Sequence, residues 1–275
     1  MNRRIIEAGR ANREYWRDLW QYRELFGFLA WRDILVRYKQ TAIGAAWAIL
    51  RPALSIAVGS GVFGTLAGLP SGELPYPVLV CAGTLPWYFF AGALSESSAC
   101  MVSNAHLISK VYFPRLILPA SALVVALVDF AFSMLILAVL MAWYEVWPTW
   151  RLLALFPLTA LAMLAALGPG LLFTSLSVKY RDFRFVVPFV VQFGQFVSPV
   201  FFSSEVVRAK LGSWGALALD INPLSGIIEG FRWAICGVGS LDLRGLLVSL
   251  LVSLLMLALG LRHFRATERE FADVI

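Results

Sequence analysis

Charged residues, histidine and cysteine are scarce in this chain of 275 residues. Asp, Glu, Lys and Arg together make up 15% of it. Its two histidines, His106 and His263, have no partner at the spacing of metal ligands, and its three cysteines form no CxxC pair. We therefore expect no metal site, and we expect the cysteines to be small apolar packing residues.

The sequence also lacks the common signatures of nucleotide-binding and hydrolytic enzymes. None of its four lysines follows a glycine, so the P-loop motif GxxxxGK[ST] is absent, as are GxSxG and HExxH. The first forty residues are polar and basic, which predicts that there is no cleavable signal peptide. These absences favour a protein that is not an enzyme and holds no cofactor of its own.

Hydrophobic residues, in contrast, make up 60% of the chain, and the mean hydropathy is +0.76. Soluble domains contain roughly 45–50% apolar residues, so the composition predicts an all-α integral membrane protein. A membrane-spanning helix needs about 20 apolar residues. Six stretches are long enough, at roughly 42–66, 77–100, 116–143, 152–177, 185–202 and 243–261.

Lysine and arginine are distributed unevenly over the connections between these stretches. Seventeen fall on the side of the N-terminal region, the loops 101–115 and 178–184, and the C-terminal tail, whereas five fall on the other side. Because positive residues are retained in the cytoplasm, both termini are predicted to be cytoplasmic and residues 203–242 to face outward. The net charge of +6 is interpreted as a mark of this topology rather than of nucleic-acid binding.

The residues before the first span form an amphipathic pattern. Phe28, Trp31, Leu35 and Tyr38 share one helical stripe, and Asp33, Arg37 and Gln40 fall opposite. A basic amphipathic helix with aromatic anchors is typical of the membrane interface. The alternative is a solvated helix that packs on a partner protein.

Small residues and carboxylates mark positions inside the spans. Ser60, Gly64 and Gly68 form a ridge that lets another helix approach closely, within the subunit or across a dimer. Glu96 and Asp129 are the acidic residues in the spans. Since a carboxylate inside a membrane is expensive, Asp129 is expected to face the bundle interior with a partner; a role in transport is the alternative.

The fifth stretch combines an aromatic face with a polar one. At helical spacing, Phe185, Phe189, Phe193 and Phe196 lie beside Gln192, Gln195 and Ser198. Amides are poorly suited to lipid, so this face is expected to line protein or a water-filled path. Aromatic rings beside amides suit sugars, which stack and form hydrogen bonds. The alternative is a stripe packed inside the bundle, with its glutamines bonded to neighbouring helices.

Residues 222–237 predict a helix with both ends marked. Asn222 can cap its first turn, Pro223 occupies the first helical position, and Gly237 can close its end. One face is apolar and consists of Leu224, Ile227, Ile228, Phe231 and Ile235. The helix is too short to cross a bilayer, so it is expected to lie at a membrane surface or to dip into it.

Five segments resemble the membrane subunit of polysaccharide ABC exporters of the O-antigen, capsule and teichoic-acid type. They are spread over the whole chain and follow each other in the family's order. They are residues 37–41 (RYKQT) with Gly44 and 47–52, residues 104–115 (NAHLISKVYFPR), residues 179–183 (KYRDF), residues 198–200 (SPV) and residues 222–237. Each segment alone is weak, but together they are specific, and the O-antigen branch is the most similar.

The resemblance implies a six-helix half-transporter that dimerises and docks two P-loop ATPase subunits, which hold ATP and Mg²⁺. Residues 1–41 would be a cytoplasmic region with an interface helix at 25–40, and residues 42–275 the transmembrane domain. Residues 101–115 would hold the coupling helix. Its ATPase-facing residues would be His106, Leu107, Lys110, Val111, Tyr112, Phe113 and Arg115. Apolar residues exposed on this loop would mark the partner site; the alternative is a loop folded back on the membrane.

The resemblance also assigns an external gate and a conduit. Residues 203–240 would form two re-entrant gate helices, with gate residues Asn222, Pro223, Glu229, Phe231, Arg232 and Trp233. Glu229 and Arg232 would pair with each other or across the dimer, or would form a solvated surface pair. The first and fifth spans would line the conduit, with Trp47, Arg51, Phe185, Phe189, Gln192, Phe193, Gln195 and Phe196. Arg51 would meet a substrate pyrophosphate or extend to the cytoplasmic surface.

The sequence thus predicts a permease of the bacterial inner membrane that exports an undecaprenyl-linked polysaccharide. A separate ATPase would supply the energy, and no nucleic acid would be involved. One alternative is a permease of the same fold for a lipid or a small drug-like molecule. Another is a membrane assembly subunit that transports nothing. A secondary transporter is disfavoured, because the spans hold few carboxylates.

Overall fold

The computed structural model describes residues 12–39, 46–70, 74–237, 241–268 and Phe271. Gln40, Thr41 and Gly44, used above, lie outside the described residues. The described part of the chain is helical and contains no strand. Its elements are α1 (Asn12–Gln21), α2 (Arg23–Lys39), α3 (Ala46–Gly59), the π-helix η1 (Ser60–Leu66), α4 (Tyr76–Ser103), α5 (Ala105–Lys110), α6 (Ile117–Trp143), the 3₁₀-helix η2 (Trp150–Ala154), α7 (Leu155–Lys179), α8 (Phe183–Val197), α9 (Ser204–Ile221), α10 (Pro223–Cys236) and α11 (Leu243–Thr267).

Among the described residues, five helical segments are long and apolar enough to cross a membrane. They are residues 46–66, 76–103, 117–143, 150–179 and 243–267. The fifth predicted stretch, 185–202, is a shorter helix, because α8 ends at Val197 after 15 residues. Ser198 precedes Pro199 and adopts an extended backbone, as the residue before a proline prefers. Six uninterrupted spans are therefore not present in the described chain.

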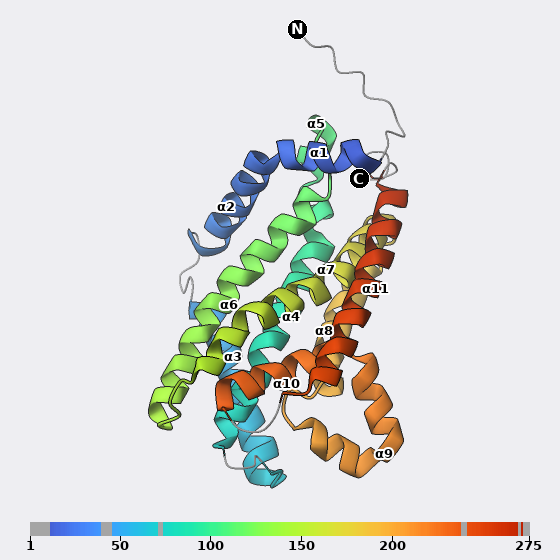
Figure 1. The fold of residues 1–275 in the computed structure, drawn as a ribbon. Coiled ribbons are helices and arrows are strands. Elements are labelled where there is room, and N and C mark those ends of the chain that lie inside the picture. The colour runs from blue at the N-terminus through green and yellow to red at the C-terminus, as the bar shows by residue number, and fades with distance from the viewer. Residues whose placement is uncertain (1–11, 40–45, 71–73, 238–240, 269–270, 272–275) are drawn as a thin grey trace.

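α4 is the central helix of the bundle. It packs against α3, α6, α7, α8 and α10. In its most apolar stretch of 18 residues, 83% of the residues are buried. On one side of it, α7 and α11 cross at close range (Figure 1). A Cβ atom added to Gly168 of α7 would lie 2.5 Å from the backbone nitrogen of Leu257, so only glycine permits this crossing.

The predicted ridge at Ser60, Gly64 and Gly68 is used within the subunit. Gly64 lies against the ring of Tyr76 at the start of α4, where an added Cβ would meet the ring at 2.8 Å. Gly68 lies beyond the helix and has a φ of 59°, a left-handed conformation that favours glycine. The expectation of one continuous helical ridge is therefore wrong at its third position.

The short helices gather at opposite ends of the bundle (Figure 1). α1, α2, α5 and the C-terminal end of α11 lie at one end, and α9 and α10 lie at the other. Each end has its own hydrophobic cluster: one includes Leu29, Phe113 and Phe264, and the other includes Phe130 and Phe231. The arrangement agrees with the side of each connection inferred from the charges.

Candidate conduit, coupling segment and gate

The aromatic stripe of α8 lies on the outside of the subunit. Phe185 is 80% exposed, and Phe189, Phe193 and Phe196 are more than half exposed. The rings of Phe189 and Phe193 lie 4.3 Å apart, centroid to centroid. The phenylalanines are therefore not packed inside this bundle, which was the alternative explanation for the stripe.

The two glutamines beside the stripe differ in their surroundings. Gln192 is exposed, whereas the amide of Gln195 donates a hydrogen bond of 3.2 Å to the hydroxyl of Ser55 on α3. This bond places α8 beside α3 in space. On α3, the apolar residues Trp47, Leu50, Leu54 and Val58 are also exposed.

A cavity of about 390 Å³ opens between α2, α3, α4 and α6. Trp47 and Arg51 line it, and the Arg51 guanidinium lies 6.0 Å from the centre of the Trp47 ring. Tyr88 and Phe89 of α4 contribute further aromatic surface. The cavity thus combines a cation with aromatic rings near the end of the bundle that holds α2.

The same cavity contains an ion cluster that joins α2 to two spans. Arg37 pairs with Glu96 of α4 (Nη1–Oε1, 2.7 Å) and with Asp129 of α6 (Nη2–Oδ2, 2.6 Å). The hydroxyl of Tyr38 donates to the other oxygen of Asp129. Burial disfavours the charge of Arg37, but the two carboxylates outweigh this effect and raise its pKa. The expectation that Asp129 has an interior partner is confirmed.

The predicted faces of α2 divide differently in the structure. Phe28 and Trp31 are exposed, while Leu29 and Ala30 are buried and α2 packs on α6. Tyr38, assigned to the apolar stripe, shares Asp129 with Arg37, which was assigned to the opposite face. The sequence analysis did not identify the partners of Asp129. A usable signal was the presence of two carboxylates inside the spans, together with a basic Arg37-Tyr38-Lys39 motif shortly before the first span.

The coupling segment, residues 101–115, contains a short helix and an extended end. Residues 101–103 belong to α4, and α5 covers Ala105–Lys110. His106, Lys110, Val111 and Tyr112 are exposed, with Tyr112 63% exposed, and Leu107 is half-buried. The side chains from Ile108 to Phe113, with Arg115, line a cavity of about 260 Å³.

Phe113, one of the predicted ATPase-facing residues, is buried instead. It is 4% exposed and, together with Ile108, belongs to the hydrophobic cluster with Leu29 and Phe264. The prediction is wrong for Phe113, because the loop turns back onto α2 and α11. The exposed apolar surface of the coupling segment is thus limited to Val111 and Tyr112.

α10 has the predicted caps. The side chain of Asn222 accepts a hydrogen bond from the Leu224 N–H (3.0 Å), Pro223 begins the helix, and Gly237 ends it with a φ of 67°. Its apolar face is buried against α4, α7 and α11, with every member at most 2% exposed. Protein covers α10 on most sides. The expectation that this helix lies at a membrane surface or dips into it stays a prediction.

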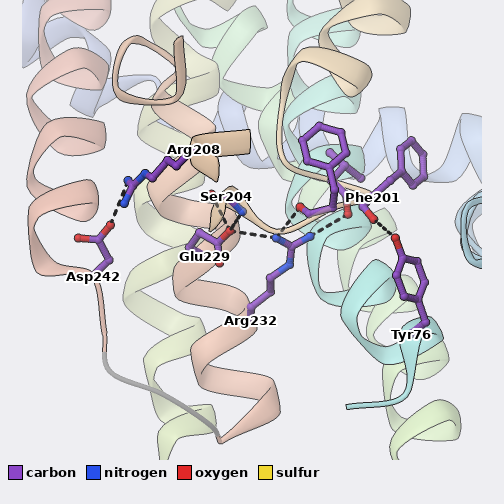
Figure 2. A network of polar contacts seen from close by, with 9 residues as sticks. Tyr76, Phe201, Ser204, Arg208, Glu229, Arg232 and Asp242 are labelled. Atoms are coloured by element: carbon purple, nitrogen blue, oxygen red, sulfur yellow. Dashed lines mark hydrogen bonds and ion pairs between the residues drawn. The ribbon is translucent and has the colours of Figure 1, made fainter. Parts of the chain in front are cut away.

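Glu229 and Arg232 form a pair in which the arginine is buried and the carboxylate is partly exposed. Arg232 is 6% exposed, and its Nη1 lies 3.0 Å from Glu229 Oε1. Arg232 also donates to the backbone carbonyls of Phe202 (2.9 Å) and Val200 (3.0 Å), as Figure 2 shows. Glu229 accepts hydrogen bonds from the backbone N–H and the hydroxyl of Ser204. The pair therefore fixes the chain between α8 and α9.

Other elements hold the same connecting residues. The hydroxyl of Tyr76 donates to the carbonyl of Phe201 (2.7 Å; Figure 2). The rings of Phe63 and Phe201 stack with their centres 5.2 Å apart. On the far side of α10, the Arg151 guanidinium lies 5.1 Å from the centre of the Trp233 ring. Phe231 is fully buried and meets Phe130 of α6 edge to face. The gate residues inferred from the sequence thus lie together, as packing residues.

Comparison with known proteins shows which family the chain belongs to. The chain is 27% identical to the O-antigen export system permease protein RfbA of Myxococcus xanthus over 262 residues, covering 94% of this chain and 98% of that protein. It is 24% identical to a protein of the same name from Klebsiella pneumoniae, over 89% of this chain and 92% of that protein. It is 23% identical to the polysialic acid transport protein KpsM of Escherichia coli, over 86% and 91%. A family model described as ABC-2 type transporter matches residues 24–236, and the chain therefore belongs to the ABC-2 type transporter family.

Proposed function

We propose that this chain is the permease subunit of an exporter that moves a lipid-linked polysaccharide across the bacterial inner membrane. One observation carries the proposal: α8 presents exposed phenylalanines and an exposed glutamine on a chain whose relatives are named for O-antigen export and polysialic acid transport. If α8 faced only lipid, the amide of Gln192 would lack hydrogen-bond partners and would be costly to place there. A second copy of the chain, placed against α3 and α8, would turn this face into the wall of a conduit.

The conduit would bind its polymer weakly at many places. Aromatic rings stack on the apolar faces of sugars, and the neighbouring amides exchange hydrogen bonds with hydroxyls. A long chain slides only if no single site traps it, so a row of similar rings serves better than one tight pocket. The cavity with Trp47 and Arg51 would receive the polar head of the carrier lipid, because a guanidinium donates two parallel hydrogen bonds to a phosphate.

The remaining parts of the proposal concern topology and partners. The end of the bundle with α1, α2 and α5 would face the cytoplasm and would dock two ATPase subunits on the coupling segment. α8 with residues 198–203 would complete a sixth crossing, and α9 and α10 would form the re-entrant gate on the outer side. The high density of positive residues on the first side supports this orientation.

The proposal is tested by removing one ring and one amide from the stripe. Gln192→Ala with Phe193→Ala is expected to lower surface glycan about tenfold, because two neighbouring contacts of the path are lost. Surface glycan is measured by immunoblotting, and the membrane content of the protein is measured in the same cells. Phe156→Ala is the matched control, because Phe156 is an exposed phenylalanine of α7 on another helix. Normal glycan export by the double variant would overturn the assignment of the stripe.

A further inference from the structure

The coupling segment ends at Arg115, and the C-terminal end of α11 holds this residue. The Arg115 backbone N–H donates to Glu268 Oε1 (3.1 Å), and the Arg115 guanidinium donates to the backbone carbonyl of Glu268. The guanidinium also lies 5.8 Å from the centre of the Phe271 ring. Two positions near the C-terminus therefore contact one residue of the coupling segment, more than 150 positions earlier in the sequence.

The C-terminal end is itself fixed in the core. Phe264 and Phe271 are at most 2% exposed and meet edge to face, with their ring centres 5.4 Å apart. Both belong to the hydrophobic cluster that contains Ile108 and Phe113 of the coupling segment. The hydrophobic contacts and the contacts of Arg115 thus join the same two regions.

α1 completes this contact from the other side. The hydroxyl of Tyr15 lies 3.4 Å from Glu268 Oε1, and the Arg265 guanidinium lies 4.7 Å from the centre of the Tyr15 ring. Burial raises the pKa of Glu268, whereas the Arg115 N–H and the charges of Arg115 and Arg265 oppose this rise. Glu268 is therefore a partly buried acceptor for two segments, and nothing in its local sequence indicated this role.

We infer that Glu268 and Phe271 position the coupling segment and carry its displacement into the membrane helices. The inference rests on the proposed function for the partner that displaces the segment, and on the structure for the contacts. A loop without such contacts would move by itself when an ATPase displaces it. A loop bound at Arg115 instead transmits the displacement to the end of α11, which binds this arginine. α11 receives the displacement and transmits it to α7, against which it packs closely at Gly168 and Gly260.

The contact is tested first on the permease alone. Hydrogen–deuterium exchange is measured on the full chain in lipid nanodiscs, for the peptide that contains the Arg115 amide. Glu268→Ala removes the acceptor and is expected to speed exchange there about fivefold or more, because the amide then opens more readily. Glu24→Ala, at an exposed carboxylate of α2, is the matched control. Unchanged exchange in Glu268→Ala would overturn the contact, whatever the ATPase does.

The positioning role is tested in the complex with the co-expressed ATPase. Glu268→Gln and Phe271→Ala are expected to keep the amount of complex and the ATP turnover, while glycan exported per ATP hydrolysed falls about fivefold. Phe271→Leu should restore most of the loss, because it refills the apolar site. Unchanged export per ATP, together with faster exchange in Glu268→Ala, would make the contact purely structural and overturn the role. A native chain that forms no complex would refute the proposed function instead, and the exchange experiment would still decide on the contact.

Discussion

α9 and α10 are consecutive helices at the same end of the molecule, yet their surroundings differ sharply. α10 buries ten of its residues, including Arg232, whereas α9 buries Ser204, Gly215 and Leu219. Large apolar side chains of α9, such as Leu211 and Trp214, are exposed on the subunit. The resemblance predicts that both helices form one gate. In the structure, α10 belongs to the core and α9 is a peripheral element.

The polar contacts of the two helices differ in the same way. In the Glu229–Arg232 pair of α10 the charged atoms lie 3.0 Å apart and the arginine is buried. Two pairs join α9 to α11 and to the residue before it, Arg208–Asp242 and Asp220–Arg244; their charged atoms lie 3.8 Å apart, and all four side chains are at least about a third exposed. Exposed pairs of this length contribute little to stability. A rearrangement at this end of the molecule is therefore expected to cost least in α9.

The largest predicted effect comes from removing the arginine of α10. Arg232→Met keeps much of the side-chain volume but leaves Glu229 and the carbonyls of Val200 and Phe202 without their buried donor. Since each buried acceptor left without a partner costs about 1–3 kcal/mol, the free energy of unfolding is expected to fall by about 3–5 kcal/mol. Denaturation in mixed micelles, followed by tryptophan fluorescence, measures this change.

The matched variant on α9 is Arg208→Met. Since Arg208 is half-exposed and its partner Asp242 is 3.8 Å away, the expected loss is at most about 1 kcal/mol. Equal losses for the two variants would contradict the division between a core helix and a peripheral one. A large loss for Arg208→Met alone would reverse it.

An effect between those of the two arginine variants is expected at the bend of α9. Gly212 has a φ of 57° and a ψ of −133°, a conformation that other residues adopt only under strain. Gly212→Ala is therefore expected to cost about 1–3 kcal/mol, and to raise hydrogen exchange in α9 but not in α10. Gly27→Ala in α2 is a suitable control, because space surrounds Gly27 and its backbone is helical. An equal rise of exchange in α10 would show that the two helices open together.

Local signals in the sequence predicted the local structure well. The ends of four spans agree with the predicted stretches to within a few residues at most boundaries, because an uninterrupted apolar run defines a membrane helix. The caps of α10 follow from Asn222, Pro223 and Gly237, which act within one turn. The fifth stretch failed where Pro199 interrupts it, since composition alone does not show where a helix ends.

The burial of polar residues could not be derived from periodicity. An amphipathic pattern assumes that the polar side of a helix meets water, but the polar side of α10 meets the carbonyls freed by the break at Pro199. Phe113 was misplaced for a similar reason, because its environment comes from α2 and α11, which are distant in the sequence. A usable signal existed for Arg232: a proline break inside the membrane needs buried donors nearby.

The smallest effect concerns the N-terminal caps of the two helices. Asn222 caps α10 and also donates to the hydroxyl of Ser198 (2.8 Å), whereas Ser203, at the corresponding position of α9, makes no capping hydrogen bond among the described residues. Asn222→Ala is expected to cost about 1 kcal/mol of unfolding free energy, and Ser203→Ala close to none. Ser198→Ala separates the two contacts, because it leaves the cap intact and removes the acceptor of the second bond. Unfolding measurements that rank Ser198→Ala with the native chain would assign the effect to the cap. A ranking with Asn222→Ala would assign it to the bond that ties α10 to the end of α8, and the stability of α10 would then depend on the connection it holds rather than on its own first turn.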